Sequence, residues 1–144
     1  MKLDYTIIDA IDSICIYWKD LDGKVVGCNK GLCRIAGVVN REEIIGKTDF
    51  ELPWRSEAAK IREMDQAVVS NNRSYQMQET IIMDDGSVVI FLTTKTPLVK
   101  NNRIVGVVGV SVNITEHKQL EAELEAKDKE IARIRNLNDD KENF

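Results

Sequence analysis

The side chains that most often carry out catalysis are scarce in this sequence. Nucleophilic and acid–base catalysis usually need a base whose pKa lies near neutrality, and histidine is the commonest one. The chain of 144 residues has a single histidine, His117, at the start of a charged C-terminal stretch. A Ser-His-Asp or Cys-His site among the preceding residues is therefore excluded, and we expect this chain alone not to be an enzyme.

Motifs that bind phosphate groups or metal ions do not occur either. Gly46-Lys-Thr48 resembles the end of a phosphate-binding loop, but Arg41 stands where that loop needs its first glycine. No metal-ligand spacing joins the remote histidine to the three cysteines, Cys15, Cys28 and Cys33. We therefore predict no metal site, and we expect the three thiols to be buried and reduced.

Composition and charge narrow the class of protein further. Hydrophobic residues make up 43% of the chain and charged residues 31%, which is typical of a folded domain. The apolar run over residues 104–110 is too short to span a bilayer, and acids at positions 4, 9 and 12 do not fit a signal peptide. We expect a cytoplasmic protein whose segment does not insert into membranes. The net charge of -4 and the scattered basic residues lead us to expect no nucleic-acid partner.

Alternating and apolar runs predict strands in two groups joined by short turns. The turns include Asp20 to Gly23 and Asp85-Gly86, which favour hairpins and hence an antiparallel sheet. Gly106 and Gly109, inside a strand pattern, indicate close packing or a bulge. The predicted strands cover residues 13–19, 24–28, 75–83, 88–96 and 104–112.

Helical patterns lie between the two strand groups and at both ends. The middle of the chain predicts helices over residues 30–36, 41–45 and 54–70, the last with Ile61, Met64 and Val68 on one face. Residues 1–11 form a predicted amphipathic helix. Its apolar stripe of Leu3, Ile7 and Ile11 fits packing on its own sheet or on a second subunit. The fold class is therefore α+β, with helices covering one face of the sheet.

The residues from Thr115 onward contain no glycine or proline and many helix formers. A seam of apolar residues with a period of 3.5 predicts a coiled coil, which would make the protein a homodimer, although Lys127 interrupts it. A solvated amphipathic tail is the alternative. The seam consists of Leu120, Leu124, Ile131 and Ile134.

Five segments in this order resemble a PAS sensor domain. They are Asp-Leu-Asp-Gly-Lys-Val-Val-Gly-Cys-Asn at 20–29, Ile-Ile-Gly-Lys-Thr-Asp-Phe at 44–50, Asp85-Gly86, Pro97-Leu98, and Gly-Val-Val-Gly-Val-Ser-Val-Asn-Ile-Thr at 106–115. The resemblance covers residues 12–118. It implies a five-stranded antiparallel sheet of order 2-1-5-4-3, short helices over one face, and a ligand site between the two layers.

The same resemblance divides the chain and suggests its role. Residues 1–11 would be the N-terminal helix, 12–114 the PAS sensor and 115–144 a coiled-coil signalling helix. Asn113, Ile114 and Thr115 stand where the family usually has Asp-Ile-Thr, the junction that couples sensor to helix. We therefore expect an input module that dimerises and relays a change of state through this junction to a downstream effector.

The effector suggested by the sequence is a histidine kinase of a two-component phosphorelay. Asn138 to Phe144 resembles the residues before the phosphoacceptor box of such kinases, so we expect the kinase domain downstream in the same chain. His117 is not the phosphoacceptor in this comparison, because the residues after it do not match that box. A ligand-free dimerisation scaffold in a cyclase, phosphodiesterase or transcription regulator is the alternative.

The resemblance also supplies candidate ligand residues. The polar Thr48, Asp49, Gln78 and Thr93 would lie near the mouth of the cavity, while the inward face of the strand at 88–94 stays undetermined because both of its faces are apolar. A missing Asn-Cys-Arg-Phe motif argues against a flavin–thiol adduct, and a core without histidine argues against haem. A small apolar ligand, a non-covalent flavin and no ligand stay open. The candidate pocket walls are Phe50, Leu52, Ile61, Met64, Met77, Ile90, Val108 and Val110.

Overall fold

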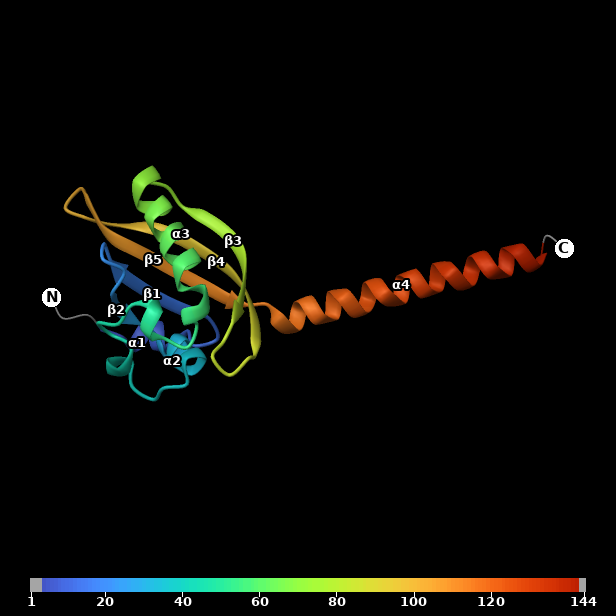
Figure 1. The fold of residues 1–144 in the computed structure, drawn as a ribbon, viewed down its shortest axis with the longest axis horizontal. Coiled ribbons are helices and arrows are strands. Elements are labelled where there is room, and N and C mark those ends of the chain that lie inside the picture. The colour runs from blue at the N-terminus through green and yellow to red at the C-terminus, as the bar shows by residue number, and fades with distance from the viewer. Residues whose placement is uncertain (1–3, 143–144) are drawn as a thin grey trace. The chain divides into compact units, whose positions relative to one another are not determined.

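This computed structural model describes residues 4–142. Five antiparallel strands form one sheet in the order β2-β1-β5-β4-β3 (Figure 1). The first strand pairs with the last, so that Cys15 lies opposite Ser111 and Trp18 opposite Val108. The predicted α+β fold and strand order are thus confirmed. The strands are β1 (Cys15–Asp20), β2 (Val25–Cys28), β3 (Tyr75–Ile82), β4 (Val88–Lys100) and β5 (Arg103–Asn113).

The turns between strands follow from local side-chain chemistry. Between β1 and β2, the Asp20 carboxylate accepts hydrogen bonds from the backbone N–H groups of Asp22 and Lys24, both at 3.0 Å. The β4–β5 hairpin places Asn101 and Asn102 in the left-handed region, at φ 52° and 62°. Asparagine tolerates that region better than most residues do, so Asn-Asn fixes the tight turn.

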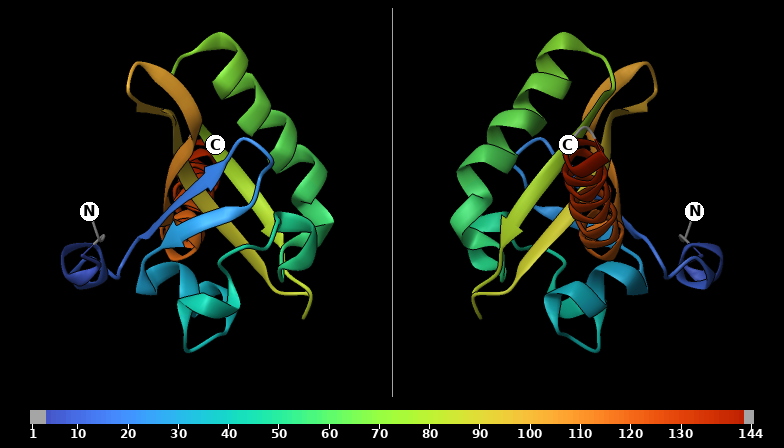
Figure 2. Two further views of the ribbon diagram at one scale, coloured as in Figure 1. Left: turned by 90° about the vertical axis from the view of Figure 1, so that its left-hand side faces the viewer. Right: turned by 90° about the vertical axis from the view of Figure 1, so that its right-hand side faces the viewer.

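Short helices and one longer helix connect the two strand groups. They are α2 (Lys30–Ala36), α3 (Ala58–Asn71) and the 3-10 turns η1 (Arg41–Glu43), η2 (Asp49–Glu51) and η3 (Arg55–Glu57). A further short helix, α1 (Thr6–Ala10), precedes β1. The predicted helix over residues 54–70 is therefore a 3-10 turn followed by α3. Figure 2 shows α3 against one face of the sheet and α1 toward its other side.

Asn29 joins the N-terminal segment to this core. Its side chain is fully buried, and its Oδ1 accepts hydrogen bonds from the backbone N–H groups of Ile16 and Leu32. Its Nδ2 donates to the carbonyl oxygens of Ile11 and Ile14, at 2.7 and 2.9 Å. The backbone after α1 is thus hydrogen-bonded to the core of its own chain. Of the expected apolar stripe, however, Ile7 is 71% exposed and Ile11 45%, and Leu3 lies outside the described residues.

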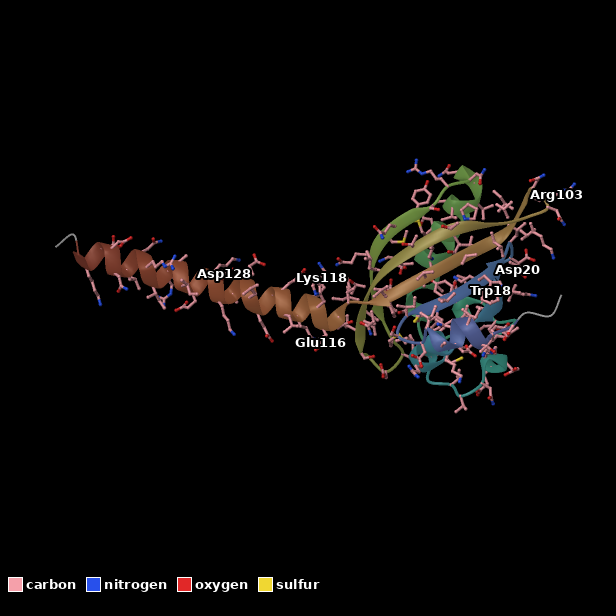
Figure 3. The ribbon with its side chains drawn as sticks, turned by 180° about the vertical axis from the view of Figure 1, so that it is seen from behind. Trp18, Asp20, Arg103, Glu116, Lys118 and Asp128 are labelled. Atoms are coloured by element: carbon pink, nitrogen blue, oxygen red, sulfur yellow. The ribbon has the colours of Figure 1, made fainter. Side chains whose placement is uncertain are left out.

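Of the described residues, those from 4 to 113 form one compact unit, and those from Ile114 to Glu142 form a second. The second unit is α4 (Thr115–Glu142), a helix of 28 residues whose charged side chains stand out along its length, such as Glu116, Lys118 and Asp128 in Figure 3. Each residue of the predicted seam is roughly half exposed on it. Within residues 4–142, no helix combines the length and apolarity that crossing a bilayer requires.

Candidate functional site

A cavity of about 60 Å³ lies between the inner face of the sheet and the helices. Strand alternation decides which residues reach it, because side chains two apart share a face. In β1 these are Cys15, Tyr17 and Lys19, and from β5 Ser111 reaches it. The apolar part of the wall is formed by Val25, Leu32, Ile35, Trp54, Ile61, Ile81, Met83 and Phe91.

Four charged side chains are buried at one side of this cavity. Lys19 Nζ lies 2.7 Å from Asp49 Oδ2 and 2.8 Å from Asp65 Oδ2, and Lys95 Nζ lies 2.8 Å from Asp65 Oδ1. The indole N–H of Trp54 donates to Asp49 Oδ1 at 2.8 Å. We call Lys19, Asp49, Asp65 and Lys95 the buried tetrad; none of the four is more than 5% exposed.

The tetrad favours the charged forms of Lys19 and Asp65. Burial opposes the charge on Lys19, but the carboxylates of Asp49 and Asp65 outweigh it and raise the pKa of Lys19. Burial also opposes the charge on Asp65, but Lys19 and Lys95 outweigh it and lower the pKa of Asp65. Two cations and two anions thus neutralise one another inside the domain.

A chain of hydroxyl groups crosses the sheet beside the tetrad. Tyr17 Oη lies 3.0 Å from Ser111 Oγ, which lies 2.9 Å from Thr93 Oγ1. Burial raises the pKa of Tyr17, so its hydroxyl stays protonated at neutral pH. The Tyr17 ring lies directly over Gly109, where an added Cβ would be 2.2 Å from ring atom Cε2. The close packing predicted at Gly109 is therefore confirmed.

Two polar groups in the cavity wall keep unused hydrogen-bonding capacity. The Lys95 ammonium has three donors, and within residues 4–142 its one hydrogen-bond partner is Asp65. Glu79 of β3 lines the cavity, and in the same described range its carboxylate accepts no hydrogen bond. These groups could bind a ligand, whereas no cluster within residues 4–142 could hold a metal ion.

Of the eight predicted pocket residues, Ile61 lines the cavity and the others lie elsewhere. Phe50 is 56% exposed, because Asp49 takes the inward position of η2. Leu52 is buried in the core, and Met64 and Met77 are half-buried outside the lining.

The three strand residues Ile90, Val108 and Val110, predicted as candidate pocket walls, do not line the cavity. Phe91, Lys95 and Ser111 line the cavity, so the alternate positions of β4 and β5 lie on the opposite face. Trp18 is on that face as well, which Figure 3 shows from outside. Both faces of these strands are rich in branched apolar residues, so hydrophobicity could not distinguish them.

The predicted polar residues near the cavity mouth have mixed positions. Asp49 lines the cavity and Thr93 belongs to the hydroxyl chain, whereas Gln78 is exposed. The backbone N–H of Thr48 donates to the Glu51 carboxylate at 2.9 Å, which makes Thr48 part of a helix cap.

Sequence reasoning missed three members of the tetrad, which are Lys19, Asp65 and Lys95. A signal existed, because Lys19 continues the inward series of Cys15 and Tyr17. Asp65 falls between Ile61 and Val68 on the apolar face of α3, all three being buried. A charge at an inward position needs a buried partner, so three such residues in one domain indicate an ionic network.

The predicted signal junction joins the cavity wall to the second unit along the chain. Ser111 is in the cavity wall, β5 ends at Asn113, and α4 begins at Thr115. The backbone N–H of Lys118 donates to the carbonyl oxygen of Ile114 at 2.9 Å, within the first turn of α4. The chain therefore passes from cavity wall to helix within four residues.

A largely apolar cavity with a few polar groups in its wall is the kind of site in which proteins often bind small molecules. Five antiparallel strands in this order, with helices over the cavity, give this domain the architecture of a sensor. The chain belongs to the PAS fold family, which it matches over residues 8–119. It is therefore a PAS sensory domain followed by a long helix.

Comparison with known proteins shows similarity to one curated protein and to several solved structures. An uncharacterized protein of Sinorhizobium fredii, y4lL, is 28% identical over 83% of this chain and 15% of its own length. VqmA of Vibrio cholerae, in a complex with ligand and DNA, is 25% identical over 79% of this chain and 52% of its own, with a TM-score of 0.69. The PAS domain of Bordetella pertussis BvgS is 19% identical over 88% of this chain and 94% of its own, with a TM-score of 0.65. The chain thus spans a small part of y4lL and about half of VqmA.

The expectation that this chain has no nucleic-acid partner is wrong, because a structurally similar protein binds DNA. VqmA has the same fold and a structure in complex with DNA. The net charge of -4 belongs to this chain alone and does not decide what a longer protein built on this fold binds.

Proposed function

We propose that this domain is the input module of a signal-transduction protein, that it binds a small molecule in the cavity, and that it relays the binding to α4. The observation that carries the proposal is the position of Ser111. This cavity residue is on β5, and β5 continues through Asn113, Ile114 and Thr115 into α4. A shift of β5 on binding would therefore reach the helix directly, without catalysis by this chain.

The output in this proposal is a change in how two copies of α4 pair. The seam of Leu120, Leu124, Ile131 and Ile134 has coiled-coil spacing, and its residues are 45–61% exposed. An apolar seam of this width is suited to a partner helix. A small change in helix register or angle would reposition an effector.

For the effector we propose a histidine kinase domain that follows in the same chain, on the resemblance of Asn138 to Phe144 to the residues before a phosphoacceptor box. A transcription regulator is the second candidate, favoured by the VqmA complex with ligand and DNA. A His-(Glu/Asp)-(Leu/Ile)-Arg-Thr-Pro box soon after Phe144 in the coding sequence would support the kinase, and a DNA-binding domain would support the regulator.

Ligand binding is tested by denaturing the purified protein and identifying released small molecules by mass spectrometry. The recovered molecule should bind again, as measured by calorimetry. Ile61→Phe should fill the cavity and abolish binding, whereas the matched change Val110→Phe, on the opposite sheet face, should preserve it. Recovery of no molecule, with no binding from a metabolite extract, would instead support the ligand-free scaffold.

Pairing of α4 is tested by sedimentation of the full chain. Leu124→Asp places a charge in the seam and should convert dimer to monomer. Ala126→Asp adds the same charge to an exposed position outside the seam and should leave the dimer intact. A chain that is monomeric at high micromolar concentration before any substitution would contradict the pairing.

A further inference from the structure

The cavity contains its own counterions, and this constrains the charge of a ligand. Lys19 and Lys95 are each within 2.8 Å of a carboxylate oxygen of the buried tetrad, whose charges sum to zero. The tetrad itself therefore offers a ligand no excess charge to neutralise, and Glu79 is the one other charged side chain among the described residues that line the cavity. Bringing a charged molecule into this largely apolar space would require its desolvation without a compensating ion pair.

Glu79 opposes an anionic ligand in particular. Its side chain lines the cavity, and within residues 4–142 its carboxylate accepts no hydrogen bond. It is near enough to Tyr17 to contribute to the raised pKa of that hydroxyl. A ligand carboxylate in the cavity would be repelled by Glu79, whereas an N–H or O–H donor would satisfy it.

Lys95 opposes a cationic ligand for the complementary reason. Its ammonium is 1% exposed and uses one of three donors on Asp65. A ligand without an acceptor would leave the other donors of this buried ammonium unsatisfied, which weakens binding. The Tyr17 ring cannot readily accept a second cation, because Lys19 Nζ already lies 5.5 Å from its centroid.

The rest of the wall favours a flat apolar body. Trp54 and Phe91 contribute aromatic surface, and Ile61 and Ile81 contribute aliphatic surface. The one polar atom of the Trp54 ring already donates to Asp49, so Trp54 offers a ligand its ring alone.

We propose that the cavity selects a small, uncharged, planar molecule with a hydrogen-bond acceptor for Lys95 and a donor for Glu79, such as an aromatic amide or lactam. This inference rests on the proposed function, namely that the cavity binds a ligand. It goes further by assigning Lys95 and Glu79 as the groups that reject ions of either sign.

The test uses three probes of nearly equal shape and different charge: benzamide, benzoate and benzamidinium. Calorimetry and thermal unfolding of the full chain should show that benzamide binds and that the affinity for each ion is at least about tenfold lower. Glu79→Gln keeps the size of the side chain and removes its charge, so benzoate should gain affinity while benzamide keeps its own. Glu63→Gln, an exposed change on α3, should alter neither.

The outcomes separate this inference from the proposed function. Equal binding of benzamide and benzoate, or discrimination unchanged by Glu79→Gln, would overturn the charge selection while leaving ligand binding established. If none of the probes binds, the molecule released from the purified protein decides: a neutral amide-like compound supports the inference and an ion overturns it. Absence of both probe binding and a released molecule would overturn the proposed function itself.

Discussion

The sheet unit and α4 use the same charged residue types in opposite ways. In the sheet unit, Lys19 and Lys95 each lie 2.8 Å from a carboxylate oxygen of Asp65, and all three residues are at most 4% exposed. Lys19 also lies 2.7 Å from Asp49. In α4, Lys129 pairs with Glu125 at 3.5 Å, and both side chains are more than 70% exposed. The contribution of these ion pairs to stability therefore depends on their burial rather than on their number. The buried pairs stabilise the core, whereas the exposed pairs mainly keep the surface hydrated.

The energetic consequence follows from the surroundings of each pair. An exposed pair gains little, because water and salt screen it and two flexible side chains lose freedom. A buried network gains more Coulomb energy but has already lost hydration, so removing one partner leaves an isolated buried charge.

The largest expected effect is from Asp65→Ala, which leaves two buried lysines without their shared carboxylate. We expect a loss of about 3–5 kcal/mol in the free energy of unfolding, measured by urea denaturation. The matched change Glu130→Ala breaks the α4 pair with Arg133 and should not move the urea midpoint. Similar shifts of the urea midpoint for the two variants would contradict the inference that buried ion pairs stabilise the protein more than exposed ones.

A smaller effect is expected from Lys95→Met, because Lys19 continues to neutralise Asp65. We expect a loss of about 1–3 kcal/mol by the same measurement. Lys129→Met is its counterpart on α4 and should be close to neutral. A cost for Lys95→Met above that for Asp65→Ala would show that Lys95 is the centre of the tetrad.

Acid should weaken the core through Asp65. Its pKa is lowered in the folded state from an ordinary value of 3.8, so its stabilising contribution is complete above that value and is lost as the pH falls through the folded pKa. Thermal unfolding between pH 6 and pH 2 should show this loss, and Asp65→Asn should have a shallower dependence. Equal pH dependence of the two proteins would contradict a charged Asp65 in the fold.

Salt should act on α4 and leave the tetrad nearly unchanged. The positions flanking the seam are mostly acidic, so two parallel copies would place Glu123 of one near Asp128 of the other. Raising NaCl from 0.02 to 0.5 M screens this repulsion and should tighten the dimer roughly three- to tenfold in sedimentation. Asp128→Lys should reverse the sign of the dependence, while Asp139→Lys, on the outer side of α4, should not.

The strand order came from the resemblance to PAS domains. Most element boundaries could be predicted from the residues themselves, because turn residues such as Asp85-Gly86 and the alternation in residues 75–83 are local signals. The inward face of β4 was not predictable, since Ile90 and Phe91 are equally apolar and tertiary packing chooses between them. The tetrad was missed because its partners are distant along the chain: Lys19 meets Asp65 only once β1 and α3 pack together. The acidic composition, in turn, describes one module and does not predict what a longer protein binds.

A substitution at Gly109 is a simple way in which the volume of the cavity could change during evolution. Its missing side chain makes room for the Tyr17 ring, since a methyl group there would overlap ring atoms at 2.2–2.6 Å. A single glycine-to-alanine change would push that ring toward the cavity and reduce its volume without touching a charge. Related sensors could therefore differ in the size of the molecule they accept while keeping the same proposed selection against charged ligands by Lys95 and Glu79.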